Sequence, residues 1–175
     1  TVKIDVFPIP DQEIDHEQII HFGQSFSVNL NPKYEYSWTP RDFLICNNNC
    51  QSINASPNED IIYYLIYNDE NGCSHKDSII AKVIFPIFIP NTFTPNGDGK
   101  NDVFYAYSKV LEQYELLIYD RWGNLAFKTE DLSKGWDGRI NGNPQPQDVY
   151  VYKLNYILKY TRNWREKVGT VTLIR

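Results

Sequence analysis

The chain has 175 residues, enough for one large or two small domains, and 42% of them are hydrophobic, which allows a buried core. A formal net charge of -5 argues against a nucleic acid or an anionic membrane surface as partner, because binding phosphates requires a cationic face. Aromatic residues make up 15%, thirteen of them tyrosines, and this composition favours β-strands over helices.

The beginning of the chain predicts a strand and a module boundary. Thr1 to Val6 lacks the charged-then-apolar pattern of a signal peptide, so we expect a piece of a longer protein. Residues 2–10 resemble residues 80–90, since each is a strand followed by a proline-punctuated exit. Chance similarity is the alternative. The repeat predicts two domains, residues 1–86 and 87–175, with residues 1–10 as the exit strand of a preceding repeat.

Period-2 alternation in the first half predicts a β-sandwich. Apolar residues alternate with polar ones over Phe26–Leu30 and again over Tyr34–Trp38. Ile61–Tyr67 is a continuous apolar and aromatic run, which predicts a central strand covered on both faces. A turn at residues 68–72 then leads into a partner strand over Ser78–Phe85. The pattern is typical of an all-β domain.

The second half predicts a second all-β unit. Tyr114–Tyr119 and Leu125–Lys128 are expected to be strands on either side of a turn. From Tyr150 to Tyr160 every even position is large and apolar, which predicts a long strand with one buried face. A final strand is expected over residues 168–175. No apolar run approaches the roughly 18 residues that a membrane-spanning helix needs.

The stretch Asn91–Phe104 cannot form regular structure, because Pro95 lacks a donor and Gly97 and Gly99 admit positive φ angles. Oxygen ligands at short spacing in such a loop predict a calcium site formed by Asn96, Asp98, Asn101 and Asp102. Lys100 within the loop, and the lack of a following bidentate Glu, count against calcium. The alternative is that the Asn and Asp side chains accept hydrogen bonds from nearby backbone amides in Asx turns.

The three cysteines allow three disulfide pairings. Cys46 and Cys50 flank three asparagines, where a local disulfide can close, and Cys73 follows a turn. Zinc is the alternative, but the cysteine and histidine spacing matches no zinc site well.

No catalytic motif occurs in the sequence, so we expect a protein that is not an enzyme. Trp122 and Trp136 lie beside turn residues. We expect both in the core or stabilising a turn; the alternative for Trp122 is an exposed ring that stacks on a sugar.

Four blocks of the second half, in order, resemble one family. They are IPNTFTPNGDGKNDVF, LIYDRWGNLAF, GWDGRING and DVYVYK with the final GTVTLIR, together covering about residues 89–175. They resemble the gliding-motility-associated C-terminal domain, the type B sorting domain of the type IX secretion system of Bacteroidetes. The family often has Gly at the position of Asp148, a difference that touches only a turn.

The first half resembles an Ig-like or PKD-like surface repeat, through Tyr36–Pro40, Leu44–Cys46 and the Gly72-Cys73 pair. The two resemblances imply two consecutive Ig-like β-sandwich domains. Related repeats can lack the first two cysteines while keeping Gly-Cys, which implies a disulfide between Cys46 and Cys50 and a free Cys73.

The resemblance implies a folded export signal that delivers the protein across the outer membrane to the cell surface, linked to gliding motility or adhesion. Its implied partners are the type IX outer-membrane translocon and a PorP/SprF-like β-barrel protein, and the fragment itself is expected to be monomeric. Because a terminal strand can pair through a free edge, we expect recognition at Gly169, Thr170, Val171, Thr172, Leu173, Ile174 and Arg175, together with the loop around Asp98. The alternative function is a surface adhesin module that binds carbohydrate or polymer.

Overall fold

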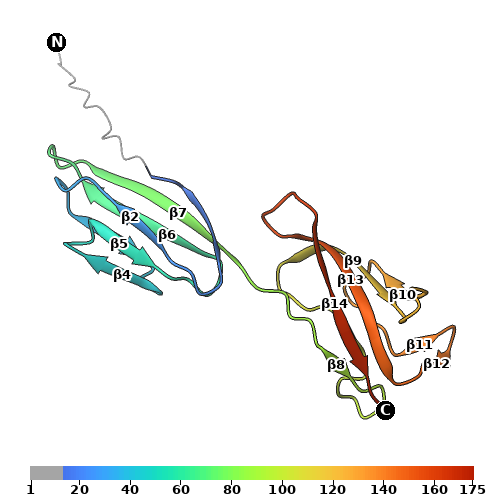
Figure 1. Ribbon diagram of the computed structural model, residues 1–175. Helices are drawn as coiled ribbons and strands as arrows, with labels where there is room; N and C mark the ends of the chain where they lie inside the picture. Colours follow the sequence, from blue (N-terminus) through green and yellow to red (C-terminus); the bar gives the residue numbers. More distant parts are fainter. Residues whose placement is uncertain (1–13) are drawn as a thin grey trace. The chain divides into compact units, whose positions relative to one another are not determined.

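The computed structural model describes residues 14–175, which contain strands and no helix (Figure 1). The strand and exit expected over residues 1–10 lie outside the described residues. Contacts divide the described residues into two compact units, one that ends at residue 84 and one that spans residues 85–175. The all-β prediction is confirmed. Within residues 14–175 there is no helix that is long and apolar enough to cross a membrane.

The first unit contains two sheets. A four-stranded sheet has the order β1-β7-β6-β3, with β1 parallel to β7, and a three-stranded sheet has the order β2-β5-β4. The strands are β1 (Glu17–His21), β2 (Phe26–Asn29), β3 (Tyr36–Thr39), β4 (Leu44–Asn47), β5 (Ser52–Ala55), β6 (Ile61–Asn68) and β7 (Ser74–Ile84). Ile53, Trp38 and Leu65 are fully buried, as expected of a core between sheets.

Strand β6 differs from its prediction. Tyr63 and Leu65 are fully buried, but Ile62 and Tyr64 are 41% and 51% exposed, so only one face of the strand is covered. The prediction of burial on both faces was wrong, because an antiparallel strand needs only one face packed on the core, even where its sequence is apolar throughout.

The second unit is built on a five-stranded sheet with the order β10-β9-β13-β14-β8. Its strands are β8 (Thr92–Phe93), β9 (Leu111–Tyr119), β10 (Leu125–Thr129), β13 (Asp148–Leu158) and β14 (Arg165–Leu173), and a small hairpin is formed by β11 (Arg139–Ile140) and β12 (Asn143–Pro144). Figure 1 shows β9, β13 and β14 side by side. Tyr150, Tyr152 and Leu154 are buried, which confirms the predicted one-sided strand over these residues. The strand ends at Leu158, so Tyr160 lies beyond it in a turn.

One face of this sheet carries the core of the second unit. Phe93, Leu116 and Leu154 from the sheet pack in one cluster with Phe104 and Trp136, which come from the segments that cover the sheet. Phe104 and Trp136 are also joined by two backbone hydrogen bonds of 2.8 Å. The covering segments are therefore fixed both by hydrogen bonds and by apolar burial.

Candidate functional site

The loop at residues 94–102 is organised around the Asp102 carboxylate. One of its oxygens accepts a hydrogen bond from the Gly97 amide and the other from the Gly99 amide, each at 2.7 Å. Both glycines have φ near +82°, a conformation that favours glycine. The Gly97 amide, with a smaller contribution from Gly99, holds the pKa of the Asp102 carboxyl below its ordinary value.

The other polar side chains of the loop form Asx turns. Asn96 Oδ1 accepts from the Asp98 amide at 3.1 Å, and Asp98 Oδ1 accepts from the Lys100 amide at 2.7 Å. The Asn96 side-chain amide donates to the second oxygen of Asp98 at 3.2 Å. These hydrogen bonds are the ones expected if the Asn and Asp side chains of the loop form Asx turns.

The residues expected to bind calcium do not fit such a site as they are arranged. Calcium takes six to eight oxygen ligands, whereas the carboxylate oxygens of Asp98 and Asp102 already accept hydrogen bonds within the loop. Among residues 14–175 there is no group of three or more His, Cys, Asp or Glu side chains arranged for a metal ion. Calcium binding at Asn96, Asp98, Asn101 and Asp102 stays an untested prediction.

The terminal segment, Gly169–Arg175, is only partly a free edge. Strand β14 pairs with β13 along its whole length, and Thr172 and Leu173 also pair in parallel with Thr92 and Phe93 of β8. The expectation of an edge that is free to the end of the chain was therefore wrong. Strand β8 occupies the edge of β14 at residues 172 and 173. That edge is therefore open only over the earlier residues of β14.

The structure nevertheless brings the terminal segment and the loop together. A Cβ built on Gly138 would lie 2.8 Å from Leu173, 3.1 Å from Pro95 and 3.3 Å from Arg175, so all three lie against the same glycine. The Arg175 guanidinium donates to the backbone oxygens of Gly138 and Gln145. The predicted recognition residues and the loop that begins at Pro95 thus form one continuous region.

Trp136 and Trp122 have opposite environments. Trp136 is fully buried, with its ring centroid 4.6 Å from that of Tyr150 and its Nε1 donating to the Arg139 oxygen at 2.9 Å. Trp122 is 80% exposed. The prediction of a core or turn-stabilising role for the Trp122 ring was wrong, because the turn is stabilised by Asp120, whose Oδ1 accepts from the backbone amides of residues 122 and 124 at 2.8 Å.

Asp148 forms an ion pair with Arg121, which lies in the same turn as Trp122. The Arg121 side chain holds the pKa of the Asp148 carboxyl below its ordinary value. This ion pair therefore links the turn before β10 to the start of β13.

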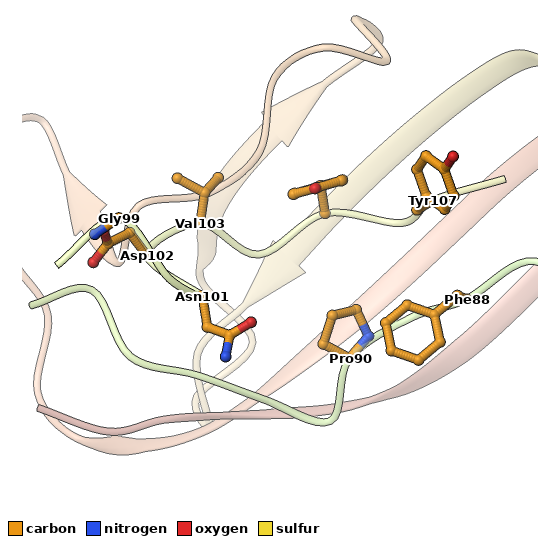
Figure 2. A pocket seen from close by; sticks show the side chains of 8 residues that line it. Phe88, Pro90, Gly99, Asn101, Asp102, Val103 and Tyr107 are labelled. Carbon is orange, nitrogen blue, oxygen red and sulfur yellow. The ribbon is translucent and has the colours of Figure 1, made fainter. Parts of the chain in front are cut away.

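An open groove of about 450 Å³ lies beside the loop (Figure 2). Phe88 and Pro90 come from one of the segments that line it, and Val103, Tyr105 and Tyr107 come from the other. The three aromatic rings are well exposed: Phe88 65%, Tyr105 44% and Tyr107 56%. Asn101 and Asp102 add polar side chains at the end near the loop.

In the first unit, Cys46 and Cys50 are joined by a disulfide, and Cys73 is free and exposed. The bonded pair lies at the end of β4 and in the turn that follows it. The Cys50 backbone oxygen accepts a hydrogen bond from Trp38 Nε1 at 3.2 Å, so the turn is attached to the core of its unit.

Comparison with known proteins identifies the second unit. A family model described as the CHU_C type IX secretion signal domain matches residues 87–173. The second unit of this chain belongs to that family. A type IX secretion signal implies interaction with the secretion machinery and export from the cell.

Solved structures establish the fold. The crystal structure of the insect immune protein hemolin matches with a TM-score of 0.51 at 10% identity, over 94% of this chain and 46% of hemolin, which confirms the Ig-like prediction. The Ig1 and Ig2 domains of DIP-gamma match with a TM-score of 0.45 at 12% identity, over 96% of this chain and 99% of that one. This chain thus spans less than half the length of hemolin. No match was found among curated proteins.

Sequence reasoning did not find the groove of the type IX signal domain. The part of the sequence that borders the groove is the segment from Val103 to Tyr107. In it, Phe104 and Ala106 are buried while the residues on either side of them are exposed. A segment that is apolar on both faces gives no indication of which face is covered.

Proposed function

We propose that the second unit is a folded export signal, which carries the attached Ig-like unit across the outer membrane to the cell surface. The family match over residues 87–173 is the observation that carries this proposal. The same residues form a compact unit with its own hydrophobic core, which supports recognition of a folded domain. We propose that the exported protein takes part in gliding motility or adhesion. Residues 87–175 are the proposed bounds of the signal domain.

We further propose that the type IX translocon, together with a PorP/SprF-like β-barrel protein, contacts the region formed by Gly169–Arg175 and the neighbouring loop. The exposed part of this region includes Thr170, Ile174 and Arg175. Arg175 lies against Gly138, as Leu173 and Pro95 do, which supports a single contact surface. Pairing through the strand edge is restricted to the part of β14 before Thr172, because β8 occupies the rest.

Export is tested by fusing residues 87–175 to an inert passenger protein in a cell with a working type IX system. A fusion to residues 14–84 is the matched control, since it supplies a similar β-sandwich without the signal unit. We expect the first fusion on the cell surface and the second inside. If both fusion proteins stayed inside the cell, the proposal would be contradicted.

The proposed contact surface is tested with point variants. A deletion of residues 169–175 would not be suitable, because it would also remove Val171 and Leu173 from the core. Ile174→Glu places a charge at a 42% exposed position in the proposed surface, directly after β14. Val168→Glu does the same at a 58% exposed position within β14, outside that surface. We expect reduced export of the first variant only, with equal thermal stability. Equal export of both variants would show that residue 174 is not part of the contact surface.

A further inference from the structure

We propose that the groove beside the loop binds a neutral saccharide, with the aromatic side chains stacking on the sugar ring. This inference goes beyond the export role and does not depend on it. It rests on the backbone of the two segments that border the groove, on their exposed rings and on the charge of the lining.

The two segments are joined at both ends and separate in between. At one end Phe88 and Tyr107 exchange two backbone hydrogen bonds of 2.8 Å, and at the other the Thr94 amide donates to the Asn101 oxygen at 2.8 Å. Pro90 lies between these points and has no N–H, so it cannot donate to the facing segment. The ladder is therefore interrupted at the groove.

The interruption leaves backbone polar groups directed toward the groove. In an extended strand, alternate residues direct their N–H and C=O groups to the same side. Tyr107 faces the segment of Phe88, whereas Phe104 bonds to Trp136 on the other side, so Tyr105 shares the direction of Tyr107. Within residues 14–175, Tyr105 has no backbone hydrogen-bond partner, which leaves one donor and one acceptor for a ligand.

The side chains add stacking surfaces and one amide. Phe88, Tyr105 and Tyr107 expose their rings at the groove. The residues that alternate with them are buried beside the two tyrosines and partly buried beside Phe88. Figure 2 shows the Asn101 side chain directed toward the segment that carries Pro90, and no residue of the described part of the chain forms a hydrogen bond with its amide group. Aromatic surface with a few polar groups, in a groove of about 450 Å³, is typical of a small-molecule site.

The charge of the lining selects the ligand class. No Lys, Arg or His lines the groove, so an anionic ligand such as a phosphate or uronic acid has no cationic partner. The one charged residue of the lining, Asp102, is engaged by the Gly97 and Gly99 amides. A neutral ring with an apolar face and several hydroxyl groups matches these donors, acceptors and rings, which is the chemistry of a neutral sugar residue.

The test uses the full 175-residue chain, labelled with nitrogen-15 and titrated with neutral hexasaccharides of β-1,4-linked glucose, xylose and mannose. We expect at least one to shift the backbone amide signals of residues 101–107 at millimolar concentration. Tyr105→Ala and Tyr107→Ala should each weaken that binding roughly two- to twelvefold. Tyr107→Phe keeps the ring and should bind nearly as well, and Trp164→Ala, which removes a 57% exposed ring outside the groove, should bind as the wild type does.

Three results would overturn the inference. The first is the absence of binding for all three neutral hexasaccharides. The second is binding that Trp164→Ala abolishes and the groove variants leave unchanged, which would place the sugar elsewhere. The third is tighter binding of a hexagalacturonate than of the neutral hexasaccharides, which would show that the groove prefers an anionic sugar. If the folded Tyr105→Ala variant loses export while no saccharide binds, the groove instead contacts a protein of the export machinery.

Discussion

Trp122 lies in a turn of the second unit and Trp136 lies directly before a similar one, yet the first is 80% exposed and the second is fully buried. In each turn an aspartate accepts a backbone amide two residues further on: Asp120 from Trp122, and Asp137 from Arg139. Turn chemistry therefore sets the local backbone in both places. What differs is the tertiary position, because only Trp136 lies on a segment that is paired with Phe104 over the sheet. The comparison separates residues that build the fold from residues left available for contacts.

The largest expected effect comes from removing the buried ring. Trp136→Ala deletes a side chain that contacts Phe93 and Tyr150, with ring centroids 5.4 and 4.6 Å away. It should lower the free energy of unfolding of the second unit by about 3–5 kcal/mol, through lost burial and the cavity left behind. Denaturant unfolding followed by tryptophan and tyrosine fluorescence measures the change.

Trp122→Ala is the matched control for that variant. It should change the free energy of unfolding by no more than about 0.5 kcal/mol, as expected for an exposed position. A comparable loss in both variants would mean that the exposed ring also stabilises the fold, and the contrast between the two turns would disappear.

Gly135→Ala tests the close approach that places Trp136 in the core. A Cβ at this position would lie 2.5 Å from the Phe104 backbone oxygen and 2.5 Å from Val103 Cγ1. We expect a loss of about 1–3 kcal/mol in the free energy of unfolding, because the two segments must move apart. The exposed neighbour Lys134→Ala should have little effect in the same measurement, and equal stability of both variants would argue against a required close approach.

Asp102→Asn tests the carboxylate that organises the loop, through its dependence on pH. The folded-state pKa of Asp102 lies below its ordinary value of 3.8, so the unfolded chain binds the proton more tightly. Its stabilisation is therefore fully present above the ordinary value and is lost as pH falls through the folded pKa. The melting temperature of the wild type should exceed that of the variant at neutral pH, and the difference should shrink on acidification below 3.8. A difference that does not depend on pH would contradict this role.

The smallest expected effect is that of calcium on the same loop. Because hydrogen bonds already engage the carboxylates of Asp98 and Asp102, millimolar calcium should leave the melting temperature of the protein unchanged. Scanning calorimetry with calcium, and with magnesium as the control, measures this. A rise with calcium that Asp98→Asn abolishes would support the cation site instead.

Local signals in the sequence predicted much of this molecule. Alternation predicted the one-sided strand from Tyr150. An Asn-Gly pair favours a tight turn, and Asn141 and Gly142 both have positive φ. The position of Trp122 and the pairing of β8 with the end of β14 were not predictable in this way. Both depend on which segments meet in three dimensions. The groove was missed for the same reason, since Pro90 interrupts a ladder between segments whose pairing no local pattern indicates.

The most direct test of the central claim is whether the export signal is recognised as a fold. Residues 87–175 would be fused to an inert passenger as the wild type, as Trp122→Ala and as Trp136→Ala, and the fraction of each protein on the cell surface would be divided by its total cellular amount. The account predicts surface delivery of the wild type and of the stable Trp122 variant, and a severe loss for the destabilised Trp136 variant. Equal delivery of an unfolded Trp136→Ala protein would show that a linear sequence suffices, and would contradict the account.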